Sequence, residues 1–154
     1  MTSLLVVRLR GTANMRRDVA ASLERLRLLR RYTATIVPNT KDYLGLLRSS
    51  SAFVAWCEAD KGTVLKLLRE RGRLVGSKPV TDRWAQGAGF KDLEDLASKV
   101  AEGSVDLRHV HGVKPFFRLH PPLKGLKKSA NKHYRAGGLL AENPELPKIV
   151  ERMV

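Results

Sequence analysis

Residues 3–57, SLLVVRLRGTANMRRDVAASLERLRLLRRYTATIVPNTKDYLGLLRSSSAFVAWC, contain the succession of elements that decides the fold. Three runs rich in β-branched and other apolar residues predict strands, at 3–10, 33–37 and 52–57. Two runs with helical spacing lie between them, at about 15–29 and 41–48. The order β-α-β-α-β indicates an α+β fold in which both helices can cover one face of a sheet.

Details of these runs predict which residues are buried. Val19, Leu23 and Leu26 recur at i, i+4 and i+7, which gives the first helix one apolar side, and Asn14 is its predicted N-cap. The third strand is almost wholly apolar, so we assign Trp56 and Cys57 to the core rather than to chemistry.

Beyond residue 60 the pattern predicts three further helices, at about 61–72, 91–101 and 146–153. Residues 76–89, with their proline and glycines, are expected to form a loop. Residues 108–135, RHVHGVKPFFRLHPPLKGLKKSANKHYR, hold three prolines and two glycines. This stretch should be mostly extended chain or loop, and mobile from about 114 to 135 in the free protein.

The charge of the chain is concentrated in two segments. The formal net charge is +14. Residues 1–31 hold eight Lys or Arg against Asp18 and Glu24, whereas residues 108–135 hold eight and no Asp or Glu; the remainder is balanced. An acid-free basic segment favours a polyanion as partner, although a solvated basic loop is the simpler alternative.

The candidate RNA contacts are basic residues and histidines of these two segments. The first group is Arg8, Arg10, Arg16, Arg17, Arg30 and Arg31. The second group is Lys114, Arg118, His120, Lys124, Lys127, Lys128, Lys132, His133 and Arg135. Phe116, Phe117 or Tyr134 could stack on unpaired bases, and either phenylalanine could instead anchor the loop to the core.

Nothing in the sequence supports an enzyme, a cofactor or a small-molecule substrate. All four histidines lie among the basic residues of 108–135, and their spacing matches no zinc pattern. Ser104 and Ser129 have no nucleophile motif around them, and a complete phosphate-binding glycine loop is absent. Cys57 is the single cysteine, which fits a reducing cytosol, and no apolar run is long enough to span a membrane.

Several stretches resemble one family. They are residues 4–48, AWCEADKGTVLKLLRERGRL (55–74), FFRLHPPLKG (116–125) and YRAGG (134–138). In these the chain is similar to the large-subunit ribosomal protein family called L-thirty in bacteria and L-seven in the eukaryotic naming, and its length resembles the archaeal long form. Leu123 replaces a usual arginine, and Leu139-Leu140-Ala141-Glu142 replaces a Gly-x-Arg segment.

The resemblance implies a three-stranded antiparallel sheet with two helices on one face, related to ferredoxin-like folds. It implies a core at 1–60 and a long-form extension at 61–154. It further implies a structural component of the ribosome in the cytoplasm, bound to large-subunit ribosomal RNA near the 5S RNA and to neighbouring ribosomal proteins. The alternatives are a free-standing RNA-binding or regulatory protein and, from the clustered histidines alone, an RNA-directed enzyme.

Overall fold

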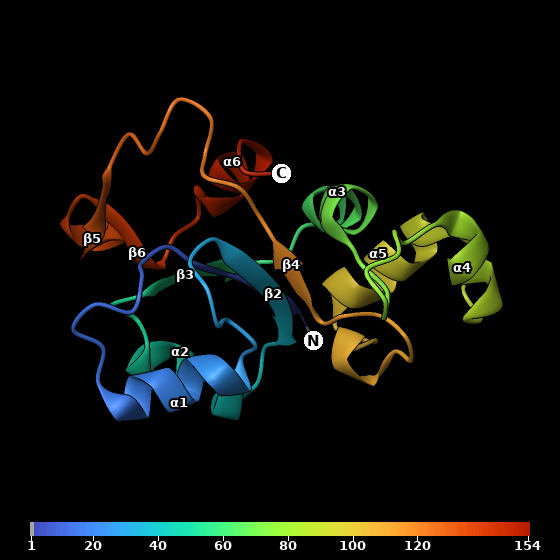
Figure 1. The fold of residues 1–154 in the computed structure, drawn as a ribbon, viewed down its shortest axis with the longest axis horizontal. Helices are drawn as coiled ribbons and strands as arrows, with labels where there is room; N and C mark the ends of the chain where they lie inside the picture. Colours follow the sequence, from blue (N-terminus) through green and yellow to red (C-terminus); the bar gives the residue numbers. More distant parts are fainter. Residues whose placement is uncertain (1) are drawn as a thin grey trace.

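The computed structural model describes residues 2–154, which form one six-stranded sheet flanked by helices (Figure 1). Across the sheet the strand order is β4-β2-β1-β3-β6-β5. The strands are β1 (Ser3–Arg8), β2 (Thr33–Pro38), β3 (Val54–Glu58), β4 (Phe116–Arg118), β5 (Ser129–His133) and β6 (Gly138–Glu142). The helices are α1 (Arg17–Arg25), α2 (Lys41–Ser49), α3 (Lys61–Arg71), α4 (Asp82–Gly87), α5 (Leu93–Glu102) and α6 (Leu146–Glu151). Two short 3-10 turns are η1 (Leu107–His109) and η2 (Tyr134–Ala136).

The central strands form the antiparallel sheet that the resemblance implies. β1 lies between β2 and β3 and is antiparallel to both, with Leu5 opposite Ile36 on one side and Cys57 on the other. The chain order β1-α1-β2-α2-β3 confirms the α+β fold class and the predicted alternation.

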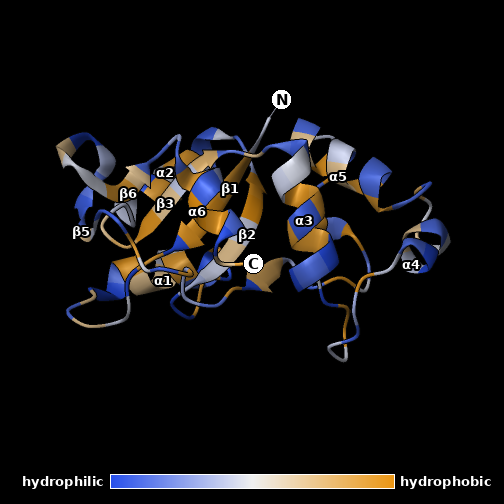
Figure 2. Cartoon of the chain, turned by 90° about the horizontal axis from the view of Figure 1, so that it is seen from above, coloured by the Kyte–Doolittle hydropathy of each residue, from blue (hydrophilic) through white to orange (hydrophobic). Residues whose placement is uncertain are grey.

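Both faces of the sheet are covered. Alternate residues of β1 point to opposite faces. Leu4 and Val6 belong to the hydrophobic cluster of α1 and α2, whereas Leu5 and Val7 belong to a second cluster with α3, α5 and α6. Figure 1 shows these two groups of helices on opposite sides of the strands. The later part of the chain therefore closes the face that α1 and α2 leave open, and Figure 2 shows the resulting hydrophobic colour along β1 and β3.

The later part of the chain also widens the sheet. β4 pairs with β2, antiparallel, and β6 pairs with β3, parallel. β5 pairs with β6 at the outer edge. The stretch 108–135 therefore contains two short strands within its extended chain, and both lie at the edges of the sheet.

Several helix boundaries differ from the predicted ones. Asn14 is not the cap of α1: it has a φ of 56°, and the helix begins after Arg16, whose side chain makes no capping bond. α1 also ends earlier than expected, because Arg27 takes a φ of 62° and Leu28 N–H donates to the Leu23 carbonyl at 2.9 Å. α4 lies where a loop was expected, and the Thr81 hydroxyl caps it by accepting from Trp84 N–H at 3.3 Å.

The predicted core residues are confirmed. Leu23 and Leu26 are 2% and 0% exposed, on the helix side that the spacing indicated. Trp56 and Cys57 are each 8% exposed and point into opposite clusters. Burial raises the pKa of the Cys57 thiol to about 12, with Glu58 and Asp60 adding to the effect, so the thiol stays neutral. Among residues 2–154, no helix has the length and apolar character needed to cross a bilayer.

Candidate nucleic-acid interface

Most of the predicted contact residues lie on the surface. Three of them are half-buried: Arg10, Lys114 and His120. The exposed ones are Arg16, Arg17, Arg30, Arg31, Arg118, Lys124, Lys127, Lys128, Lys132, His133 and Arg135. Figure 1 shows the loop between β1 and α1, together with β5, at the end of the molecule opposite α4. The two basic segments thus contribute to the same end of the surface.

Arg8 is the exception, because the fold buries it, and we leave it out of the proposed interface. Its side chain is buried, and the residue is 2% exposed. The guanidinium donates from Nε to the Arg10 carbonyl at 2.9 Å and from Nη1 to the Leu28 carbonyl at 2.8 Å. Burial lowers the pKa of this group from its usual value. Arg8 therefore ties the segment after α1 to the end of β1.

Arg10 and Arg31 are held in place but keep donors free for a partner. Arg10 donates from Nη1 to the Ala52 carbonyl at 3.1 Å and lies 5.0 Å from the centre of the Phe53 ring. Arg31 donates from Nε to the Leu9 carbonyl at 3.0 Å and stacks on Tyr32. Each guanidinium has five N–H donors. One internal hydrogen bond therefore orients the group and leaves its other donors for a partner.

Arg16 and Arg17 begin α1 with little to neutralise them. The Arg16 guanidinium lies 3.3 Å from the Asp18 carboxylate, but both side chains are well exposed. Water and salt weaken such a pair, so Asp18 offsets only part of the charge. These two residues present cations that a phosphate can approach.

The first part of the basic loop is fixed to the body of the protein. Phe117 in β4 is 0% exposed, which assigns it to anchoring rather than to stacking. Backbone N–H groups of Leu119, His120 and Leu123 donate to the carbonyls of Tyr32, Met153 and Arg152 respectively. The His120 ring nitrogens lie 2.7 Å from the Pro121 carbonyl and 3.0 Å from that of Val154. We therefore assign His120 to holding the loop and leave it out of the proposed interface.

The second part of the basic loop is more exposed. The Lys128 ammonium pairs with Glu145 at 3.1 Å and lies 5.0 Å from the centre of the Tyr134 ring. β5 carries Lys132 and His133 on an edge strand, and Arg135 follows in η2. Lys128, Lys132, His133 and Arg135 are exposed, so a polyanion can reach them.

Limited trypsin digestion of the free protein tests this division of the loop. We expect rapid cleavage after Lys124, Lys127, Lys128 and Lys132, because these residues are exposed and lie beyond most of the anchoring bonds. Cleavage after Arg118 should be slow, because β4 is paired with β2 and Phe117 is buried. Equal resistance of all five sites, measured by mass spectrometry of the fragments, would show a loop that is rigid throughout.

The structure adds two basic residues that the sequence did not single out. Arg71 and Arg73, at the end of α3, line a groove of about 190 Å³ with Lys114, Arg118 and Phe116. In the sequence they belong to RERGR, beside Glu70 and within residues 32–107, where acidic residues nearly balance the basic ones, so the charge count does not single them out. The groove brings the end of α3 next to the second basic segment.

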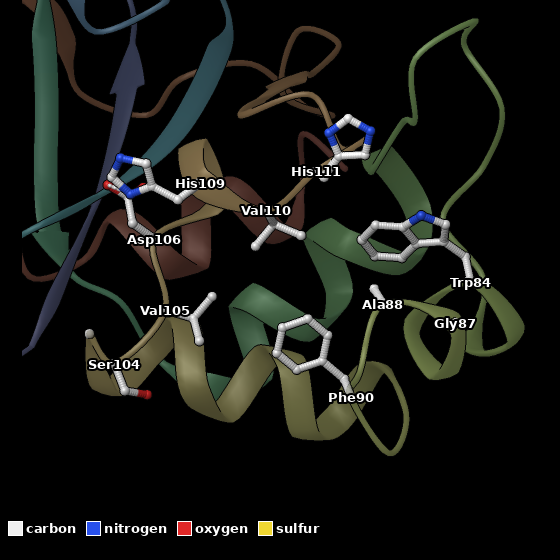
Figure 3. A pocket seen from close by; sticks show the side chains of 11 residues that line it. Trp84, Gly87, Ala88, Phe90, Ser104, Val105, Asp106, His109, Val110 and His111 are labelled. Carbon is white, nitrogen blue, oxygen red and sulfur yellow. Dashed lines mark ion pairs between the residues drawn. The ribbon is translucent and has the colours of Figure 1, made fainter.

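One cavity brings Ser104, Asp106, His109 and His111 together, yet the hydrogen-bond partner of Ser104 is a backbone carbonyl and not a base. The cavity has a volume of about 880 Å³ and lies between α4, the end of α5 and η1, with Trp84, Phe90 and Val110 among its walls (Figure 3). His109 lies 3.7 Å from Asp106 and is 86% exposed in its side chain. Ser104 donates its hydroxyl to the Lys99 carbonyl at 3.0 Å rather than to a base.

Metal binding has no support in the described part of the chain. Among residues 2–154, no group of three or more His, Cys, Asp or Glu is placed to hold a metal ion. The four histidines of 108–135 are thus not gathered into such a group.

Comparisons with known proteins point to one family. Residues 4–54 match the family model described as ribosomal protein L30p/L7e. "Large ribosomal subunit protein uL30" of Ignicoccus hospitalis is 43% identical over 136 residues, which cover 87% of this chain and 86% of the relative. The protein of the same name from Archaeoglobus fulgidus is 38% identical over 149 residues, covering 96% and 97%. That of Aeropyrum pernix is 42% identical over 142 residues, covering 88% and 87%. With such identity over nearly its full length, this chain belongs to the ribosomal protein L30p/L7e family.

Proposed function

We propose that this chain is a structural constituent of the large ribosomal subunit and binds ribosomal RNA through its two basic segments. The observation that carries the proposal is the similarity over nearly the whole chain to relatives named as proteins of that subunit. The exposed basic residues of both segments supply the chemistry. A ribosomal role needs no cofactor and no small-molecule substrate.

The first basic segment can bind phosphates directly. Arg10, Arg16, Arg17, Arg30 and Arg31 surround α1 and the loops at its two ends. The guanidinium group is planar and can donate two parallel hydrogen bonds to one phosphate, so arginine suits a backbone contact. Because this segment lies on the folded core, it offers a preformed surface.

The second segment can adapt to the RNA. Residues 108–135 combine the anchored strand β4 with the exposed Lys124, Lys127, Lys128, Lys132, His133 and Arg135. Phosphates would relieve repulsion among these charges, and the prolines limit the entropy lost on ordering. In the subunit we place this loop along ribosomal RNA near the 5S RNA, with neighbouring ribosomal proteins around it. On this view, residues 1–60 are the docking core and residues 61–154 extend it.

Sedimentation of a cell extract tests the ribosomal assignment. The tagged chain should migrate with large subunits in a sucrose gradient, and digestion of the RNA should release it. The lysines that trypsin cuts rapidly in the free protein should become protected in the assembled subunit. A slowly sedimenting pool with none in the subunit fraction would favour the free-standing RNA-binding protein instead.

A further inference from the structure

We propose that the groove between the end of α3 and β4 binds one phosphate of the RNA backbone and that Phe116 stacks on a base beside it. We name this groove the basic notch; its lining residues are Arg71, Arg73, Ser77, Lys114, Phe116 and Arg118. The inference rests on the proposed RNA-binding function and adds a specific contact to it. Arg71 and Arg73 lie outside both charged segments of the sequence. Only the fold brings them next to Lys114 and Arg118.

The basic notch has an excess of positive charge that the protein does not neutralise. Four of its six lining residues are Lys or Arg, and none is acidic. The ion pairs found within residues 2–154 include none of these four cations. Like charges gathered in a space of about 190 Å³ repel one another, and an anion with several oxygens would relieve that repulsion.

Pairing between distant segments builds the basic notch before any ligand binds. Lys114 N–H donates to the Arg73 carbonyl at 2.9 Å, and Leu74 forms a β-bridge with Val113. These contacts hold the segment after α3 against the segment that leads into β4. The buried ring of Phe117 then fixes the neighbouring residues Phe116 and Arg118 at the rim. A preformed site loses little conformational entropy on binding.

Side-chain contacts orient the donors without using them up. The Lys114 ammonium donates to the Ser77 hydroxyl at 3.3 Å and keeps its other two protons. Arg73 donates from Nη1 to the Gly72 carbonyl at 2.8 Å. The Arg118 guanidinium lies 5.9 Å from the centre of the Phe116 ring. The remaining N–H groups can donate to phosphate oxygens. Each guanidinium can donate two parallel hydrogen bonds to one phosphate, a geometry that suits phosphate recognition.

Phe116 distinguishes a nucleic-acid phosphate from a free anion. Its ring is half-buried and forms a wall of the basic notch. The same ring also lines a larger groove on the side of α1 and α2, where Arg25, Arg27 and Arg108 lie. A strand with a phosphate in the basic notch would bring a base against this ring, and stacking on an aromatic side chain tolerates any base. Free phosphate has no group to place there.

Matched variants of the full chain test the proposal. R71Q/R118Q removes two charges from the basic notch while keeping long polar side chains. K66Q/R69Q is the control, because both residues are exposed on the same helix α3 but do not line the notch. F116L removes the aromatic ring, and K114Q gives a second charge change should R71Q/R118Q fail to fold. Circular dichroism melts establish which variants are folded.

The measurement is affinity for large-subunit ribosomal RNA across a salt series. R71Q/R118Q should reduce the steepness of log affinity against log salt by about 0.7–0.9, the loss of one phosphate, relative to K66Q/R69Q. F116L should weaken binding by about fivefold or more with the salt dependence unchanged. Inorganic phosphate and ATP, titrated as separate probes, should show no saturable millimolar or tighter binding.

The results distinguish failure of the proposed RNA-binding function from failure of the phosphate site in the basic notch. If the unmodified chain fails to bind ribosomal RNA, the proposed function falls, and the basic notch falls with it. If the chain binds but R71Q/R118Q, or K114Q in its place, behaves like K66Q/R69Q, the notch inference is wrong while the RNA-binding function stands. Tight binding of phosphate or ATP that R71Q/R118Q abolishes would reassign the basic notch to a free anion and overturn the proposal.

Discussion

The affinity of this protein for ribosomal RNA should fall steeply as salt rises. Each phosphate neutralised by a Lys or Arg contributes a slope of about −0.7 to −0.9 to log affinity against log salt. Six or more such contacts, drawn from the exposed residues of the two segments, would weaken binding by about a thousandfold or more between 50 and 200 mM salt. Filter binding or fluorescence anisotropy across that range measures the slope, and a slope near zero would refute binding through phosphates.

A double variant shows whether α1 takes part. R16A/R17A should reduce the steepness by about 1.4 to 1.8 if both residues meet phosphates. The fold should be retained, because both side chains are exposed at the start of α1. R83A/K91A removes the same charge at exposed positions near α4, at the opposite end of the molecule, and should leave the slope unchanged. An equal effect of both variants would indicate that net charge, rather than this surface, governs binding.

The central fold could be predicted because its signals are local. The apolar runs and the i, i+4, i+7 spacing of Val19, Leu23 and Leu26 occur within single elements, and the structure buries those residues as expected. The sequence did not reveal that both faces of the sheet are covered. That arrangement depends on α3, α5 and α6 folding back over β1, which no local pattern describes.

The short edge strands were harder to predict for the same reason. β4 has three residues in a run that is rich in proline nearby, and it becomes a strand because β2 offers an unpaired edge. α4, with six residues, is too short for a helical period to stand out. Its N-cap at Thr81 is visible in the sequence only once the helix is known.

The candidate interface could be predicted as two charged segments but not residue by residue. Charge counts cannot separate Arg8, which the fold buries, from Arg10, which lies two residues later on the same β-rich run. The same counts overlooked Arg71 and Arg73, because neighbouring acids balance them along the chain although not in space. The basic surface therefore has to be assigned from exposure and packing.

Replacement of Phe117 by alanine should be among the most destabilising single changes in the extension. The ring is 0% exposed, and deletion of a buried phenylalanine costs about 3–5 kcal/mol. That is a large part of the roughly 5–15 kcal/mol that stabilises an ordinary domain. The loss should also release β4 from β2, since Phe117 is the middle residue of that three-residue pairing, opposite Ala34.

Phe116 provides the matched control within the same strand. Its ring is half-buried, so Phe116→Ala should lower the free energy of unfolding much less while weakening RNA binding through the lost stacking surface. Urea denaturation followed by circular dichroism gives both stabilities, and faster tryptic cleavage after Arg118 in Phe117→Ala reports the release of β4. A loss below about 1 kcal/mol for Phe117→Ala would contradict the anchoring role, because a filled core position cannot be emptied that cheaply. The opposite order of effects on stability and on RNA affinity in the two variants is the expected signature of one phenylalanine that anchors the strand and one that faces the RNA.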